Sequence, residues 1–279
     1  MELTRCKRCG GRITRRAGAY ECIGCGARYA PLSMTDAALL LGSLHDSQPS
    51  KSTADAAVPE HLSGDFEIKD GVLVKYKGEG GAVVIPAEVT TIGTAAFSRC
   101  NVLTSVTIPE TVRVIEAFAF ANCNALTSVE ISEGVQEIGN GAFSGCPVLN
   151  SVFIPGSVQT IGGSAFLGCD HLEYAIISEG VQEIGDHAFS YCRALQSATI
   201  PGSVRSVGEK AFSFCTSLNS AVLEYGVEQL GHGAFHGCTD LQTVSIPDSV
   251  ITVELDTFEG CERLQNKPDM LDFRPQNRW

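Results

Sequence analysis

The chain has 279 residues, of which 44% are apolar and 29 are glycine, and its formal net charge is −12. This composition excludes a disordered chain and indicates a folded protein with many turns. The charge is uneven, because residues 1–30 carry seven Lys and Arg against two acids, or +5, which leaves −17 for residues 31–279. The acidic part is therefore a poor ligand for nucleic acid or for an anionic membrane.

The first residues, MELTRCKRCGGR, lack the apolar stretch of a secretory signal peptide. The longest apolar run, Ala37–Leu44, is far shorter than the roughly 18 residues that a membrane span needs. We therefore expect a cytoplasmic protein without membrane contact, in which the twelve cysteines are thiols or metal ligands. A location at the cell surface is the alternative.

Four cysteines near the start of the chain have the spacing C-x2-C-x12-C-x2-C, which is typical of a zinc ribbon. They are Cys6, Cys9, Cys22 and Cys25. Each C-x-x-C turn presents two thiolates, and four thiolates complete a closed tetrahedral site. We expect one structural Zn²⁺ and two strands that meet at Ala17-Gly18. A thioredoxin-like redox motif is disfavoured, because no βαβ pattern surrounds these cysteines.

The ribbon, residues 1–30, also contains several arginines, which raises the hypothesis of a regulator that contacts nucleic acid. A solvated surface on a very small domain explains the same charge. We favour the second interpretation, because Tyr20 and Tyr29 are the only aromatic residues there on which bases could stack.

Residues 31–63 read as a flexible linker, since their serine, proline, aspartate and alanine follow no period. The stretch TDAALLLGSL within it could form one short helix, capped by Thr35 or Asp36. In residues 64–82, apolar and polar residues alternate on both sides of Asp70-Gly71. This pattern predicts a β-hairpin, because glycine tolerates the positive φ that such a turn requires. We interpret this hairpin as a cap on the repeats that follow.

From residue 83 to residue 266 a unit of 23 residues recurs about eight times without a change of period. A C-terminal tail, residues 267–279, follows the last unit. The unit reads I-G-x-x-A-F-x-x-C-x-x-L-x-x-V-x-I-P-x-x-V. Its phenylalanines are Phe97, Phe120, Phe143, Phe166, Phe189, Phe212, Phe235 and Phe258. Its cysteines are Cys100, Cys123, Cys146, Cys169, Cys192, Cys215, Cys238 and Cys261. A residue type that returns eight times at one period indicates architecture rather than a chemical site.

Each unit is predicted to contain one strand and one short helical or 3₁₀ turn. In LTSVTIP, Val106 and Ile108 share one face of a strand that Pro109 ends. In IGNGAFSGC, Ala142 and Cys146 fit one helical or 3₁₀ turn. Because no unit can bury its apolar side chains alone, we expect an α/β repeat solenoid whose strands pair in parallel.

The motifs A-F-x-x-C and LTSVTI resemble those of leucine-rich repeat proteins, specifically the BspA-type (treponemal) class, whose units have this same length. The resemblance covers residues 64 to about 266. It implies a right-handed solenoid that binds proteins or surfaces without catalysis, and the known members of this class are often exported adhesins.

Three interpretations of the eight repeated cysteines compete. They are a buried spine of small side chains beneath the phenylalanines, disulfides between neighbouring units, and a series of metal sites. Equivalent Cβ vectors in stacked units point the same way, and no histidine or carboxylate keeps step with the cysteines. We therefore predict the buried spine.

Sequence motifs of the common enzyme classes are absent, since the chain has no Gly-rich phosphate loop, no H-E-x-x-H and no G-x-S-x-G. His232 and His236 lie in one unit, without carboxylates that the sequence places beside them, and read as surface residues. We predict a non-catalytic protein-interaction module. An exported adhesin and the nucleic-acid regulator are the alternatives.

The predicted partner surface is the outward face of the strands. Most outward residues are small and polar, but the middle units present larger ones. These are Phe153, Tyr174, Ile176 and Val222, with Glu130 on the other side. An exposed apolar and aromatic cluster is typical of a binding site, although tyrosine and isoleucine also simply suit strands.

Removal of zinc should unfold residues 1–30 and leave the repeats folded, because the ribbon has too little core to fold without metal. The native protein should contain zinc by elemental analysis. A native protein without any metal would rule out the site.

Overall fold

The computed structural model describes residues 13–16, 19–22, 28–29, 64–254 and 256–265. The chain separates into two units, Met1–Ala56 and Ala57–Trp279, and each is described by itself. Several predicted features lie outside the described residues. They are the ligands Cys6, Cys9 and Cys25, the side chain of Cys22, the linker 31–63 with its short helix, and the tail 267–279.

The first unit contains a three-stranded antiparallel sheet in the order β1-β2-β3. Its strands are β1 (Ile13–Arg16), β2 (Ala19–Cys22) and β3 (Arg28–Tyr29). Arg16 pairs with Ala19, so two residues connect β1 to β2, as the sequence predicts. The zinc site itself stays a prediction.

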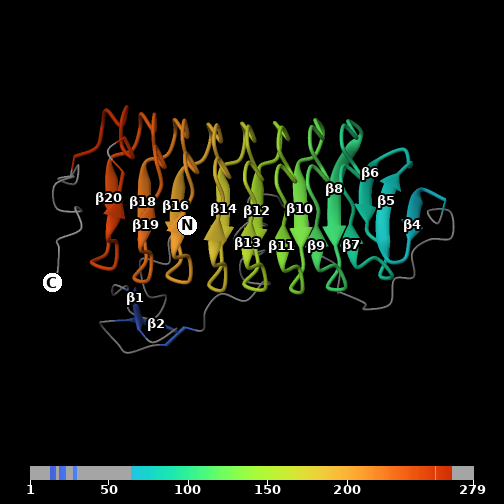
Figure 1. Ribbon diagram of the computed structural model, residues 1–279, viewed down its shortest axis with the longest axis horizontal. Coiled ribbons are helices and arrows are strands. Elements are labelled where there is room, and N and C mark those ends of the chain that lie inside the picture. Colours follow the sequence, from blue (N-terminus) through green and yellow to red (C-terminus); the bar gives the residue numbers. More distant parts are fainter. Residues whose placement is uncertain (1–12, 17–18, 23–27, 30–63, 255, 266–279) are drawn as a thin grey trace. The chain divides into compact units, whose positions relative to one another are not determined.

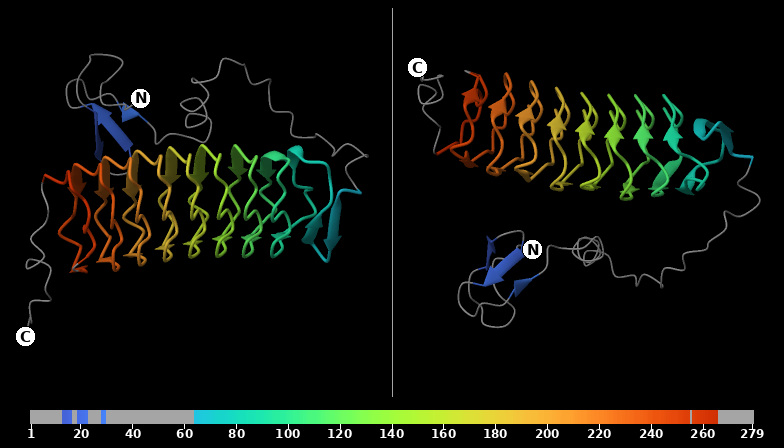
Figure 2. Two further views of the ribbon diagram at one scale, coloured as in Figure 1. Left: turned by 90° about the horizontal axis from the view of Figure 1, so that it is seen from above. Right: turned by 60° about the horizontal axis from the view of Figure 1, so that its bottom comes forward.

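The second unit is a right-handed parallel β-solenoid of about eight coils, which Figures 1 and 2 show side by side along one axis. Each coil contributes one strand to a first ladder and a shorter strand to a second ladder. The first ladder contains β6 (Gly81–Val84), β8 (Leu103–Ile108), β10 (Ser128–Ile131), β12 (Ser151–Ile154), β14 (Tyr174–Ile177), β16 (Ser197–Ile200), β18 (Ser220–Leu223) and β20 (Thr243–Ser245). The second contains β7 (Thr91–Ile92), β9 (Val114–Ile115), β11 (Glu137–Ile138), β13 (Thr160–Ile161), β15 (Glu183–Ile184), β17 (Ser206–Val207), β19 (Gln229–Leu230) and β21 (Thr252–Val253).

The register of the first ladder equals the sequence period. Val106 pairs with Val129, and Ile108 pairs with Ile131, so equivalent residues of successive coils lie side by side. In β10 the residues alternate between exposed and buried, because successive side chains of a strand point to opposite faces. The inward valines and isoleucines therefore form continuous rows in the core.

A hairpin precedes the first coil, formed by β4 (Phe66–Lys69) and β5 (Val72–Tyr76). Its turn places Asp70 at φ 50° and Gly71 at φ 78°, both in the left-handed region that a two-residue hairpin turn requires. β5 then pairs in parallel with β7, so the hairpin extends the second ladder beyond the first coil.

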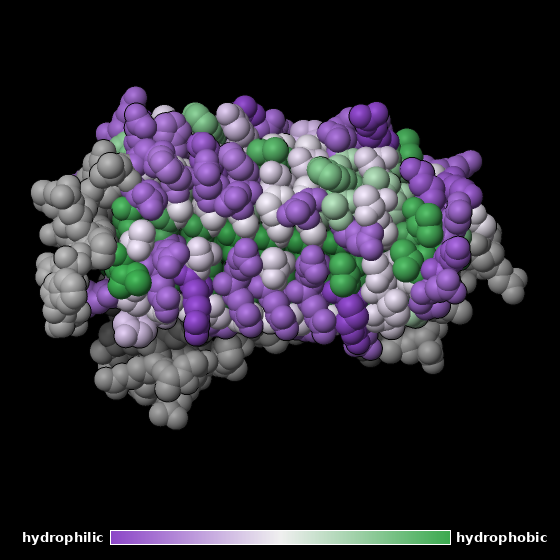
Figure 3. Space-filling model, in the orientation of Figure 1, coloured by the Kyte–Doolittle hydropathy of each residue, from purple (hydrophilic) through white to green (hydrophobic). Residues whose placement is uncertain are grey.

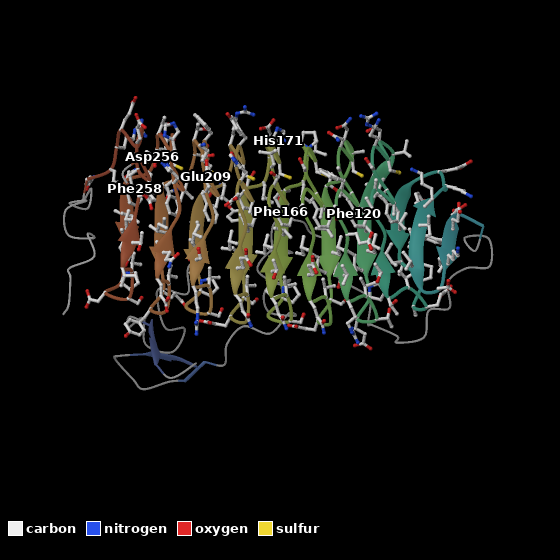
Figure 4. All side chains as sticks on the ribbon, viewed as in Figure 1. Phe120, Phe166, His171, Glu209, Asp256 and Phe258 are labelled. Carbon is white, nitrogen blue, oxygen red and sulfur yellow. The ribbon has the colours of Figure 1, made fainter. Side chains whose placement is uncertain are left out.

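The phenylalanines of the repeat form one column through the core. All eight rings are buried, and neighbouring rings are stacked with their centroids between 4.7 and 5.7 Å apart. Figure 4 places Phe120, Phe166 and Phe258 along this line. Tyr76 of the hairpin stacks on Phe97 at 4.8 Å, so the hairpin also continues the aromatic column. Each ring from Phe97 to Phe235 thus buries its two faces against neighbouring rings.

The prediction of a short helical or 3₁₀ turn in each unit is wrong, since the described residues contain no helix. The segment around Phe143 is instead a run of turns, in which alternate N–H groups donate in different directions. The N–H groups of Ala142 and Ser144 donate to carbonyls three residues earlier in the same coil. Those of Phe143 and Gly145 donate to Ala165 and Leu167 of the next coil, at 2.7 and 2.8 Å.

Two features of the backbone prevent a helix there. A helix would need every N–H to donate within its own coil, but here every second one is directed outward to the neighbour. In addition, two residues of this segment that lie four apart have a positive φ, namely Gly141 at 62° and Gly145 at 69°. The same φ occurs at Phe118 and His187, where a side chain adopts it at a steric cost.

The prediction of a buried cysteine spine is confirmed for seven of the eight cysteines, whereas Cys100 is only half-buried. Each of the seven thiols donates to the carbonyl of the phenylalanine in the preceding coil, at 3.1 to 3.2 Å. In four of these coils the same carbonyl also accepts the N–H of the cysteine in its own coil, as Phe166 does from Cys169. A cysteine therefore fills the space and supplies the second donor.

Burial keeps the thiols of Cys169 and Cys215 protonated. It raises the pKa of Cys169 and of Cys215 to about 12, because a thiolate would lose its hydration in the core. Both thiols therefore remain hydrogen-bond donors at neutral pH.

Cys146→Ala should lower the free energy of unfolding by about 1 kcal/mol, because the Phe120 carbonyl loses a donor and a small void remains. Cys146→Ser should cost about 1–3 kcal/mol, because the shorter hydroxyl is buried without full reach to that carbonyl. Cys100→Ser is the matched control at a half-buried site, with an expected cost below about 0.5 kcal/mol. Urea unfolding followed by circular dichroism measures all three, and equal costs at both positions would contradict the spine.

Alkaline pH should destabilise the solenoid. The unfolded thiols ionise near their ordinary value of 9.0, while folded Cys169 and Cys215 hold their protons to about 12. The unfolded state therefore binds fewer protons above pH 9, so stability is complete below pH 9 and falls by about 1 kcal/mol per pH unit for each thiol up to about pH 12. Urea midpoints in the presence of reductant should decrease between pH 9 and pH 11, and less steeply in Cys169→Ala. Midpoints that do not change over this range would refute the buried thiols.

Candidate functional site

The outward face of the first ladder carries two rows of equivalent residues. The row that we name the outer row contains Thr107, Glu130, Phe153, Ile176, Thr199, Val222 and Ser245. The other row is serine or threonine from β8 to β20 except at Tyr174. In β6 it holds Ala82, and the exposed Val84 occupies the outer row. Four of the five predicted partner residues thus lie in the outer row, and the fifth, Tyr174, lies beside it.

The structure brings three of the predicted residues together on adjacent strands. Phe153 of β12 and Ile176 of β14 are direct register partners, and Tyr174 lies two residues before Ile176. Phe153 and Tyr174 are half-buried, whereas 40% of Ile176 is exposed. We name Phe153, Tyr174 and Ile176 the apolar patch.

Val222 and Glu130 lie on either side of the apolar patch. Val222 is 41% exposed on β18, and Thr199 of β16 separates it from Ile176 in the outer row. Glu130 of β10 is exposed next to Phe153 and accepts a hydrogen bond from the Thr107 hydroxyl at 3.3 Å. The patch therefore has an acidic neighbour on one side and a second apolar contact further along the other.

The first ladder is interrupted beside the apolar patch. β14 and β16 are neighbours in the stack, but they share no strand pairing, so the ladder divides into two sheets at this point. The inward residues of β14 are affected as well, since Ala175 and Ile177 are only half-buried, whereas Val152 and Ile154 of β12 are buried. The patch thus lies over a less well covered part of the core.

The proline after β16 does not by itself explain this interruption. After β14 and after β18, the N–H groups of Ser178 and Glu224 donate to the preceding coil, at 3.1 and 2.9 Å. Pro201 occupies the equivalent position after β16 and has no N–H to donate to β14. Pro155 and Pro247 occupy the same position after β12 and β20, which still pair with β10 and β18. Ala198 and Ala221 likewise occupy the position of Ala175 and pair with each other, so the sequence carried no signal that could have found the interruption.

Figure 3 shows the face that carries the first ladder, where hydrophilic side chains lie on both sides of a narrow line of hydrophobic ones. The outer row lies on this ladder. Polar residues such as Thr199 and Ser151 adjoin the apolar patch, so the patch has a polar surround.

No helix long and apolar enough to cross a membrane occurs in the described part of the chain.

Comparisons with known proteins identify the repeats. A family profile described as "BspA type Leucine rich repeat region (6 copies)" matches residues 76–196 and 137–265. Among solved structures, the leucine-rich repeat protein of T. pallidum is 32% identical, with a TM-score of 0.57, and the match covers 75% of this chain and 91% of that one.

Two further solved structures are more distant. The pneumococcal vaccine antigen PcpA is 19% identical over 71% of each chain, with a TM-score of 0.46. A leucine-rich repeat protein from Bacteroides ovatus is 23% identical over 79% of this chain and 93% of that one, with a TM-score of 0.34. Curated proteins include no match to this chain. The profile match and the treponemal relative show that the chain belongs to the BspA-type leucine-rich repeat family.

Proposed function

We propose that this protein is a non-catalytic scaffold that binds a protein partner through the apolar patch on the first ladder. The observation that carries the proposal is the coincidence of Phe153, Tyr174 and Ile176 with the interruption between β14 and β16. Elsewhere on this face the outward residues are mostly small and polar. One site on a repetitive surface has therefore changed in side chains and in backbone pairing together.

The chemistry of the patch fits a protein ligand. Tyrosine and phenylalanine supply large rigid contact areas, and such residues dominate the energetics of protein interfaces when polar residues surround them and exclude water. Glu130 and the serines and threonines of neighbouring strands provide that surround.

The family supports the same class of function. Leucine-rich repeat proteins commonly bind protein partners, and this type of solenoid is generally a non-catalytic binding scaffold. The match with the treponemal relative covers 91% of that chain.

Residues 1–30 add a separate proposal. Their four cysteines have the number and spacing for one structural Zn²⁺, and the ligands would be Cys6, Cys9, Cys22 and Cys25. The pairing of β1 with β2 supports a ribbon, because it ends at Cys22 where a ligand is needed. Contact of this basic segment with nucleic acid is the less favoured alternative.

An exported adhesin of the BspA type would use the same scaffold at the cell surface. We favour the cytoplasm, because the seven buried thiols donate hydrogen bonds that their oxidation would remove. Detection of the protein on the outside of intact cells would establish the adhesin instead.

Tyr174→Ala combined with Ile176→Ser should weaken partner binding at least about tenfold, because the patch loses its aromatic anchor and its most exposed apolar side chain. The melting temperature should change little, since neither side chain is in the core. Partners are first recovered from native lysate with the wild-type chain and identified by mass spectrometry, and their affinity for each variant is then measured.

The matched control is Thr243→Ala combined with Ser245→Ala, an exposed pair at equivalent positions of β20. Its affinity for the recovered partner should equal that of the wild type. Equal binding by the Tyr174 and Ile176 variant would exclude the apolar patch as the binding site.

A further inference from the structure

Two histidines and two carboxylates meet on the turn side of the last two described coils. Glu259 occupies the position of His236 one coil later, and Asp256 follows the position of His232 by one residue. The Nδ1 atom of His232 lies 2.5 Å from Oδ1 of Asp256, and Nδ1 of His236 lies 3.6 Å from Oε2 of Glu259. His236, Asp256 and Glu259 each offer a ligand atom within 4.8 Å of the others, the one such group among the described residues.

The backbone and the neighbouring side chains hold this cluster in place. The N–H of Gly233 donates to Oδ1 of Asp256 at 2.9 Å, and the N–H of Gly237 donates to the Glu259 carbonyl at 2.7 Å. These hydrogen bonds fix the two coils relative to each other. The ring of Phe214 meets the His236 ring edge-on with centroids 5.2 Å apart, which limits the rotation of His236.

The carboxylates of Asp256 and Glu259 supply the negative charge that suits a cation. In Figure 4, Asp256 lies near the same edge of the solenoid as His171, which is several coils away and belongs to no such cluster.

The donor set determines which cation fits. Imidazoles with carboxylates suit Zn²⁺, Ni²⁺ and Cu²⁺, whereas Mg²⁺ and Ca²⁺ prefer oxygen ligands alone. Tetrahedral zinc with bonds of about 2.0–2.1 Å places its ligand atoms about 3.3 Å apart. The side chains of His232 and Glu259 are 62% and 68% exposed, so burial does not prevent them from rotating toward an ion.

We propose that His232, His236, Asp256 and Glu259 form a site for one divalent transition metal ion that joins the last two described coils. The ion would replace the His232–Asp256 contact and bind ligands from both coils at once. This site lies on the turn side and is independent of the apolar patch. A bound ion would therefore link the two coils whatever partner the patch binds.

The test compares zinc binding by full-length chains in a titration calorimeter, in reductant that does not bind metal. The wild type should bind one equivalent of zinc more than His236→Ala. Glu259→Gln should lower the affinity for that zinc ion at least about tenfold. His171→Ala, which removes an exposed imidazole outside the cluster, should behave like the wild type. Because chains are compared with one another, any zinc held by residues 1–30 cancels.

A second readout is the melting temperature, which zinc should raise more in the wild type and His171→Ala than in Glu259→Gln, since binding stabilises the folded state. Glu259→Gln replaces an exposed side chain, so it decides the matter even if His236→Ala folds poorly. Equal stoichiometry in wild type and His236→Ala, or equal affinity in wild type and Glu259→Gln, would overturn the proposal.

Discussion

On the turn side of the solenoid, every second backbone N–H group has no acceptor in its own coil and donates to the coil that follows, as those of Phe143 and Gly145 do. A helix would have satisfied these groups locally. Here they are buried groups that need the neighbour, and an unpaired buried N–H costs a large part of the stability of a small domain. Each coil is therefore complete only when the next one is in place.

The other regularities follow from this dependence. Hydrogen bonds between coils require equivalent backbone positions to align, which keeps the period constant along the chain and stacks identical side chains on one another. The phenylalanine column and the thiol-to-carbonyl bonds both cross from coil to coil. The bends of neighbouring coils also fit one another. Gly180 donates its N–H to the Ser203 hydroxyl of the following coil at 3.0 Å. A Cβ on Gly180 would collide with the carbonyl of Gly156 in the preceding coil. The apolar patch occurs where two neighbouring coils, those of β14 and β16, share no strand pairing.

The sequence predicts what depends on the period and misses what depends on backbone direction. The phenylalanine and cysteine rows and the parallel ladder follow from residues that recur in phase. The run of turns was mistaken for a helical turn, because positions with positive φ are filled by residues such as Phe118 and His187 as well as by glycine. The carboxylates beside His236 were missed because they lie one coil away, although a search one period further along the chain finds Glu259 directly.

Amide hydrogen exchange of Phe166→Leu tests the central claim that stability passes from each coil to its neighbours. Leucine leaves a gap between the rings of Phe143 and Phe189, which the wild-type ring contacts at centroid distances of 5.3 and 5.1 Å. The account predicts faster exchange in the coils of Phe143 and Phe189 and unchanged protection in the coil of Phe97, because interactions join nearest neighbours only. A uniform increase in exchange along the whole solenoid would contradict it.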